Sequence, residues 1–164
     1  PEFHARFSSK GKRYLYRIYN SPQRDIFRRN YVYQVSEPLD IDAMRKAAAH
    51  IVGEHDFAGF MSQGSTPQES TVRTVYSLSV TKTPESGDAA LITVAIEGSG
   101  FLYNMVRIIT GTLVEVGLHK RTPESVALAV KQADRSLAGH TAPPQGLYLD
   151  EVFYDSADFA PLNQ

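Results

Sequence analysis

The segment KRYLYRIY at residues 12–19 gives the first firm indication of the fold. Its side chains alternate so that Tyr14, Tyr16 and Ile18 share one face, which is the pattern of a half-buried β-strand. The turn-forming residues 20–22, Asn-Ser-Pro, follow at once and are expected to end the strand. The segment therefore predicts one strand of a sheet whose apolar face is turned towards a core.

The rest of the chain mixes strands and helices without the strict alternation of a parallel α/β fold. We therefore expect one α+β domain with a mostly antiparallel sheet and helices packed on one of its faces. The expected elements are a short strand at 31–35, a helix capped by Asp40 or Asp42 and stopped by Gly53, a helical turn around 55–60, a loop at 61–70, a hairpin of strands 72–81 and 91–97, a helix at 103–116 ended by Gly117, a helix from Thr122-Pro123 to about 133, and a strand at 147–153.

Composition excludes several classes of protein. The 164 residues are 42% hydrophobic and 21% charged, which is ordinary for a globular domain. No apolar run approaches the roughly 18 residues of a membrane-spanning helix. There is no cysteine, so disulfides and thiolate metal sites are excluded, and the five histidines lack the spacing of a metal site. We expect no membrane, no metal and a cytoplasmic location.

Positive charge is concentrated at the start of the chain. Residues 1–30 carry eight Lys and Arg against two acidic residues, although the whole chain has a net charge of −1. Within residues 3–19 the basic residues alternate with Tyr and Phe, a combination that suits RNA because cations hold phosphates and rings stack on unpaired bases. A half-buried strand with a solvated charged face would give the same pattern, so both interpretations stand at this point.

Arg107 is unusual because it lies within the apolar segment FLYNMVRIITGTL, residues 101–113. A guanidinium is unfavourable to bury unless a carboxylate, a phosphate or another acceptor pairs with it. The nearest acidic residues in the sequence are Glu97 and Glu115, ten and eight positions away. Arg107 therefore either reaches solvent or finds its partner elsewhere in the fold or outside this sequence.

Six short motifs in this order and spacing resemble the C-terminal half of the tRNA pseudouridine synthase A family. The resemblance runs from Phe3 to about Val152, which is nearly the whole chain. The motifs are FHARFS at 3–8, Lys12-x-Tyr14-x-Tyr16-x-Ile18, Gly53-x-x-Asp56-Phe57-x-x-Phe60, Arg73-Thr74-Val75, Phe101-Leu102-x-x-Met105-Val106-Arg107-x-Ile109-x-Gly111, and Gly146-Leu147-Tyr148-Leu149.

The resemblance implies a pseudouridine synthase-like fold and isomerisation of uridine to pseudouridine in the anticodon stem-loop of tRNA, without cofactor or metal. Tyr14 matches the tyrosine that stacks on the target base, and Arg107 matches the arginine that pairs with the catalytic aspartate. Arg6, Lys12 and Arg13 fall in the stretch expected to contact the RNA backbone. The family also implies a homodimer with tRNA bridging both subunits, and loop 61–70 departs most from the family pattern, so we expect it to influence the choice of tRNA.

One departure limits what this chain can do. The family's aspartate lies in an Arg-Thr-Asp-x-Gly motif, which is absent here, since Arg73-Thr74 is followed by Val75. The chain also opens at Pro1 without methionine. We therefore expect residues 1–164 to be the C-terminal domain of a synthase whose N-terminal domain carries the aspartate, and the chain alone to be inactive. The alternatives are a non-catalytic RNA-binding or dimerisation module, and an unrelated α+β domain with a basic strand.

Overall fold

A computed structural model describes residues 9–64 and 66–155 of the chain. Within these residues one mixed sheet of six strands follows the order β2-β1-β5-β4-β3, and β6 pairs with β1 beside β2. Most neighbours are antiparallel, and β1 with β2 is the parallel pair. The strands are β1 (Gly11–Asn20), β2 (Tyr33–Val35), β3 (Gly53–Asp56), β4 (Val72–Pro84), β5 (Ala90–Gly98) and β6 (Leu147–Phe153).

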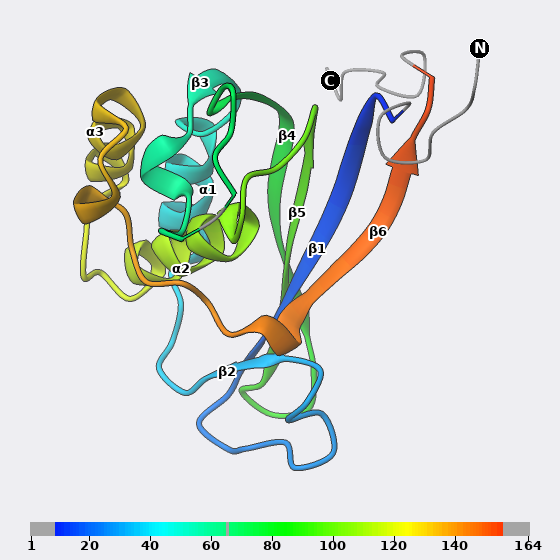
Figure 1. Cartoon of the computed structure of the whole chain (residues 1–164). Coiled ribbons are helices and arrows are strands. Elements are labelled where there is room, and N and C mark those ends of the chain that lie inside the picture. Colours follow the sequence, from blue (N-terminus) through cyan, green and yellow to red (C-terminus); the bar gives the residue numbers. More distant parts are fainter. Residues whose placement is uncertain (1–8, 65, 156–164) are drawn as a thin grey trace.

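Three α-helices cover one face of this sheet, which confirms the expected α+β class (Figure 1). Their apolar sides and the inward side chains of β1 and β5 form one core, in which Tyr16, Ile18 and Met44 are fully buried. The helices are α1 (Ile41–Ala49), α2 (Met105–Gly117) and α3 (Pro123–Gln132), and 3₁₀ turns lie at Ala58–Phe60, Arg135–Leu137 and Pro144–Gly146. No helix within the described residues has the length and hydropathy that crossing a bilayer requires.

The segment predicted as a strand from its alternation is β1, and it lies in the middle of the sheet. It pairs with β5 without a register shift from Lys12–Gly98 to Asn20–Ala90. On its other side β6 pairs with the first half of the strand, and β2 with Ile18 to Asn20. Because side chains alternate across a strand, Tyr14 lies on the same face as the buried Tyr16, towards the helices.

The helix starts follow from local capping. The Asp40 carboxylate accepts a hydrogen bond from the Ala43 amide at 2.9 Å, so Asp40 is the N-cap of α1. The Thr122 hydroxyl accepts one from the Ser125 amide at 3.2 Å at the start of α3. Helix α2 differs slightly from expectation, because it begins at Met105 and includes Gly117 instead of stopping before it.

The expected helical turn around residues 55–60 was only partly correct. Residues Gly53–Asp56 form strand β3, which pairs with Val72–Val75 of β4, and the 3₁₀ turn begins at Ala58. Partner hydrogen bonds from a distant strand outweigh the local preference for a turn here. The Asp56 carboxylate still accepts the Ala58 amide at 3.0 Å, the turn role that its sequence context indicates.

Candidate active site

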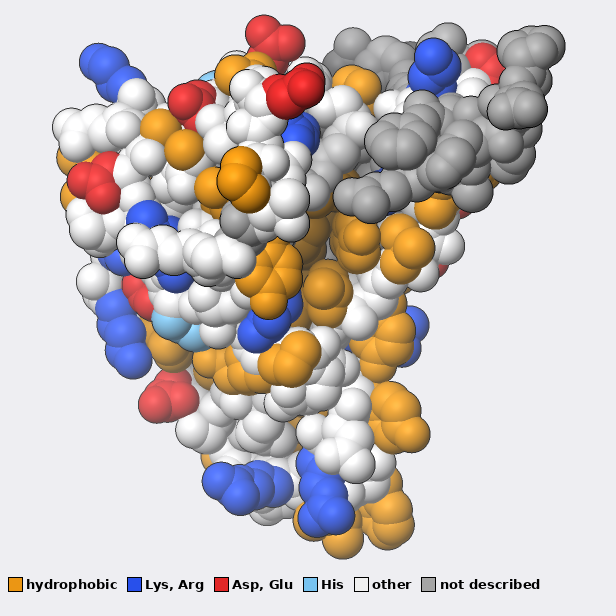
Figure 2. Space-filling model, in the orientation of Figure 1, with side chains coloured by type: hydrophobic (Ala, Val, Ile, Leu, Met, Phe, Trp, Pro, Cys, Tyr) orange, Lys and Arg blue, Asp and Glu red, His pale blue; other side chains and the backbone are white. Residues whose placement is uncertain are grey.

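A cleft of about 750 Å³ opens where the middle of β1 meets the N-terminal end of α2. In the space-filling view, hydrophobic side chains gather in a hollow between the helices and β6 (Figure 2). Residues of the 62–71 loop form part of the rim. The lining residues are Tyr14, Gly64, Thr66, Gln68, residues 101–107 and Leu147.

Tyr14 and Arg107 both line this cleft, although they are far apart in sequence. The Tyr14 ring is half-buried and meets the ring of Phe101 edge to face, with centroids 5.3 Å apart. Burial raises the pKa of the Tyr14 phenol, so the ring is neutral near pH 7. Tyr14 thus offers a flat apolar surface that Phe101 holds in position, a geometry suited to stacking on a planar ligand.

The Arg107 guanidinium is held by two neutral acceptors. Its Nε donates to the Ala142 carbonyl oxygen at 2.7 Å, and its Nη1 donates to Asn104 Oδ1 at 2.9 Å. No acidic side chain pairs with it in the described residues, and Nη2 has no hydrogen-bond partner among them. The guanidinium is therefore fixed in orientation while its Nη2 edge is available to an anion.

Asn104 begins α2 in the left-handed conformation, with φ of 60°. Its side-chain amide donates to the Ser62 hydroxyl at 2.9 Å, and its oxygen accepts from Arg107. The Ser62 amide donates to the Tyr103 carbonyl at 3.2 Å. These bonds connect the 62–71 loop to the start of α2, so the rim of the cleft and Arg107 are positioned together.

The main-chain acceptor of Arg107, Ala142, belongs to residues 138–143, a segment that we call the strap. The Ala142 amide donates to the Arg107 carbonyl at 3.0 Å, so Ala142 contacts Arg107 through both of its main-chain polar groups. The strap crosses α2 closely at Gly111, because a Cβ atom there would overlap the His140 carbonyl oxygen. Buried Tyr16 donates its hydroxyl to the Pro143 carbonyl. Main-chain packing therefore sets where the Ala142 carbonyl lies.

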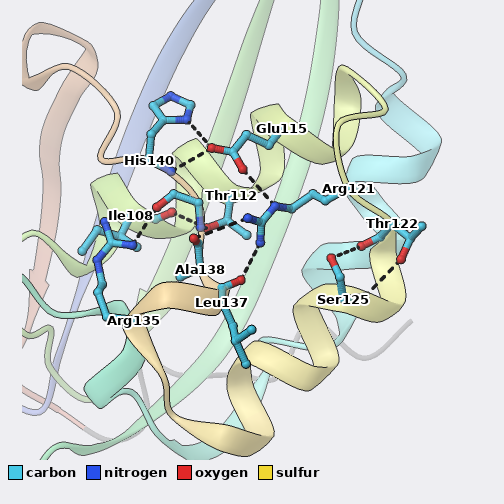
Figure 3. A network of polar contacts seen from close by, with 11 residues as sticks. Ile108, Thr112, Glu115, Arg121, Thr122, Ser125, Arg135, Leu137, Ala138 and His140 are labelled. Atoms are coloured by element: carbon cyan, nitrogen blue, oxygen red, sulfur yellow. Dashed lines mark hydrogen bonds and ion pairs between the residues drawn. The ribbon is translucent and has the colours of Figure 1, made fainter.

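A polar network holds the strap against α2 (Figure 3). Glu115 accepts from the amide and the Nδ1 of His140, both at 2.8 Å, and from the Nε of Arg121 at 2.9 Å. Burial pushes the pKa of Glu115 upwards, but hydrogen bonds from His140 and the nearby Arg121 charge hold it below its ordinary value. The Thr112 hydroxyl accepts the Gly139 amide at 2.9 Å. Helix α2 therefore carries both Arg107 and the groups that hold its acceptor.

Lys12 and Arg13, the other sequence-predicted site residues that the structure describes, do not line the cleft. Lys12 lies on the same face of β1 as Tyr14, further towards the strand's start. The Arg13 guanidinium is on the opposite face, where Nε donates to Glu97 at 2.6 Å and Nη1 to Glu151 at 3.0 Å. Carboxylates thus occupy Arg13, and the structure does not bring it to Tyr14. Arg6 lies outside the described residues.

Sequence reasoning missed the groups that hold Arg107. Asn104 was detectable, because a side chain three positions away on a helix faces Arg107, and Asn tolerates positive φ. Ala142 carried no signal, since it contributes main-chain atoms. The described residues contain no cluster of His, Asp or Glu that could hold a metal ion.

Comparison with known proteins adds independent information. The family model described as tRNA pseudouridine synthase matches residues 47–155. Proteins named tRNA pseudouridine synthase A are similar to this chain: that of Geobacillus sp. is 47% identical over 95% of the chain, that of Brevibacillus brevis 52% over 93%, and that of Bacillus subtilis 45% over 94%. The chain spans 60% of the length of each of these relatives.

Proposed function

Because this chain belongs to the tRNA pseudouridine synthase family, we propose that it is the C-terminal domain of an enzyme that isomerises uridine to pseudouridine in the anticodon stem-loop of tRNA. The family resemblance read from the six motifs is thereby confirmed. The observation that carries the proposal is that Tyr14 and Arg107 line one cleft. Two residues that the motifs match to roles in the reaction thus converge where a single nucleotide could enter.

The reaction dictates what the site must provide. In the substrate the glycosidic bond joins C1′ of the ribose to N1 of uracil, and in the product it joins C1′ to C5. The base must detach, turn and reattach through C5, with one proton lost from C5 and one gained by N1, and it can do so only outside a helical stack. Tyr14 would hold the extruded base by stacking, and Phe101 would keep the Tyr14 ring in place. Product and substrate are isomers, so the reaction consumes no oxidant or reductant, and the family resemblance implies that it uses no cofactor.

The catalytic carboxylate would come from outside this sequence. The chain contains no Arg-Thr-Asp-x-Gly motif and spans 60% of its relatives' length. An aspartate entering the cleft would meet the Nη2 edge of Arg107 and form a charge-assisted pair. That pair would lower the aspartate's pKa and fix its orientation towards the sugar. Ala142 and Asn104 support this role, because they hold the guanidinium before the carboxylate arrives.

The remaining features of the enzyme follow from the family. We propose a cytoplasmic homodimer whose two subunits share the tRNA, with no metal in the reaction. Lys12 lies on the same face of β1 as Tyr14 and would meet the RNA backbone beside the cleft, whereas Arg13 would have to leave its carboxylates to do so. Gly64, Thr66 and Gln68 at the rim would contact nucleotides next to the target, which supports a role for this loop in tRNA choice.

The test is Arg107→Ala in the complete enzyme. Removing the partner of the catalytic aspartate should lower single-turnover pseudouridine formation by about 100-fold or more. The Kd for unmodified tRNA should change by less than about threefold, since one of many phosphate and base contacts is affected. Arg107→Lys keeps the charge but loses the planar fork, so it should restore only part of the rate.

Arg45→Ala is the matched control. Arg45 is an exposed arginine of α1 that pairs with Asp42, away from the cleft. The Arg45→Ala substitution should leave both the rate of pseudouridine formation and the Kd for tRNA unchanged. An Arg107→Ala enzyme with the parental rate would remove Arg107 from the catalytic site, and a loss confined to the Kd would make it a binding residue.

A further inference from the structure

The loop between β1 and β2, residues 21–32, lies at the end of the sheet (Figure 1). It exposes large apolar side chains. Phe27 is 87% exposed, Ile26 66% and Tyr31 60%. Such side chains are normally withdrawn from water or covered by a partner when they cluster. The exposure of three such side chains within six residues therefore needs a physical reason.

The exposure does not come from a loosely held loop, because ion pairs and hydrogen bonds of charged side chains hold the loop in place. Asp25 accepts the Phe27 and Arg28 amides at 2.9 and 3.1 Å, which fixes a tight turn. The Arg28 guanidinium donates to Asp25 at 2.6 Å and to both oxygens of Glu85 at 2.9 and 2.7 Å. It also lies over the Tyr19 ring, 4.6 Å from the centroid. The turn is thus tied to β1 and to the β4–β5 connection.

Further bonds hold the second half of the loop. The Tyr148 hydroxyl of β6 donates to the Tyr31 carbonyl at 2.7 Å, and the Gln34 side-chain Nε2 donates to the Ser21 carbonyl at 2.7 Å. Val32 is buried, with 4% of its surface exposed. The outward side chains are therefore presented in a fixed arrangement, which lowers the entropy lost when a partner binds.

The surface is basic as well as aromatic. Arg24 and Arg29 are exposed, and within the described residues neither forms a salt bridge, whereas the charge of Arg28 is matched by two carboxylates. We call Arg24, Ile26, Phe27, Arg29 and Tyr31 the loop patch. Exposed rings beside unpaired cations suit RNA, because rings stack on unpaired bases and cations bind phosphates. A second copy of the chain fits less well, since self-contact would bring like charges together.

We propose that the loop patch is a second binding site for the RNA substrate, which contacts unpaired bases and phosphates remote from the nucleotide that reacts. This inference rests on the proposed function. Tyr14 and Asn20 are six positions apart on β1, and the loop follows Asn20, so about 20 Å separates the cleft from the base of the loop. Basic and hydrophobic side chains at the lower end of Figure 2 lie on the face that carries the hollow. One folded RNA could therefore reach both.

The experiment measures tRNA affinity of the complete enzyme over a salt series. Arg24→Ala with Arg29→Ala should raise the Kd about tenfold at physiological salt and flatten the slope of log K against log salt by about 1.4–1.8. Phe27→Ala should raise the Kd by about 5- to 100-fold, with the slope unchanged. Lys46→Ala with Lys131→Ala removes two exposed charges from the helical layer and should change neither quantity.

The readouts separate this inference from the proposed function. Single-turnover rates at saturating tRNA should be unchanged in the loop variants, because the chemistry takes place in the cleft. A short hairpin that ends before the loop patch should bind parental and variant enzymes equally. If the parental enzyme makes no pseudouridine but the loop variants bind tRNA more weakly than the parent, the RNA site stands and the proposed reaction is rejected. Unchanged tRNA affinity, or weakened binding that accompanies loss of the dimer in sedimentation, would overturn the loop patch as an RNA site.

Discussion

Replacing Gly111 by alanine tests whether the strap is as closely fixed as the structure indicates. A Cβ atom at Gly111 would overlap the His140 carbonyl oxygen and lie 2.9 Å from its carbonyl carbon and 3.3 Å from the Ala142 amide nitrogen. These are main-chain atoms, so no side-chain rotation relieves the contact. The strap itself must move away from α2.

The magnitude follows from two opposing effects. Alanine favours the helical state over glycine by about 1 kcal/mol. Overpacking against a rigid neighbour is unfavourable by about 1–3 kcal/mol or more, and displacing Ala142 weakens its charge-assisted bond to Arg107 by about 1.5–3 kcal/mol. We therefore expect Gly111→Ala to lower the free energy of unfolding by about 2–4 kcal/mol, which at about 2–4 °C per kcal/mol lowers Tm by roughly 5–15 °C.

Gly117→Ala is the control within the same helix. A Cβ there would meet the Met44 sulfur at 2.8 Å, and Leu39 Cδ2 and Met44 Cγ at 3.0 Å, which are side-chain atoms that can rotate away and not main-chain atoms. Its Tm should change by less than about 3 °C, because helix propensity offsets the small repacking. Calorimetric unfolding of both variants of the complete enzyme checks the prediction. A Gly111→Ala protein as stable as the parent would show that the strap yields easily, and the reasoning on Ala142 would fail.

Two further predictions concern the network and the missing aspartate. Glu115→Gln should lower the free energy of unfolding at pH 7 by about 2 kcal/mol, through weaker bonds to His140 and Arg121. Since the Glu115 pKa is held below its ordinary 4.5, the stabilisation by its charge is present above that pH and is lost as pH falls through the lower value. Thermal melts should therefore show a smaller stability difference between the parent and Glu115→Gln at pH 3 than at pH 7. An equal difference at both pH values would contradict this. The isolated 164-residue chain should form no pseudouridine in unmodified tRNA, because its sequence has no Arg-Thr-Asp-x-Gly; carbodiimide mapping above background would refute this.

Much of the fold was predictable because local sequence signals and tertiary structure agree. The alternation from Tyr14 to Ile18 matches β1, and the caps at Asp40 and Thr122 are where the helices begin. Strand β3 was not predicted, since four residues with polar character become a strand only through pairing with β4. Local patterns cannot supply that long-range information.

Part of the candidate site was likewise predictable from the sequence, and part needed the structure. Tyr14 and Arg107 were found from motifs, and their meeting in one cleft needed the structure. The sequence left the partner of Arg107 open between solvent, the rest of the fold and absent sequence. The structure adds a main-chain acceptor 35 positions away, which no side-chain pattern could indicate. The alternation of side chains along β1 already implies that Arg13 faces away from Tyr14, yet Arg13 was predicted to contact the RNA together with Tyr14.

The two-way contact between Ala142 and Arg107 has a consequence for mutational surveys. Position 142 supplies a carbonyl oxygen and an amide hydrogen, which every residue except proline also has. Side-chain scanning would therefore record only a limit on size, since Ala142 is fully buried. Replacing the amide before residue 142 by an ester, which removes the Ala142 N–H that donates to the Arg107 carbonyl, would expose a contribution that exchanging side chains leaves hidden.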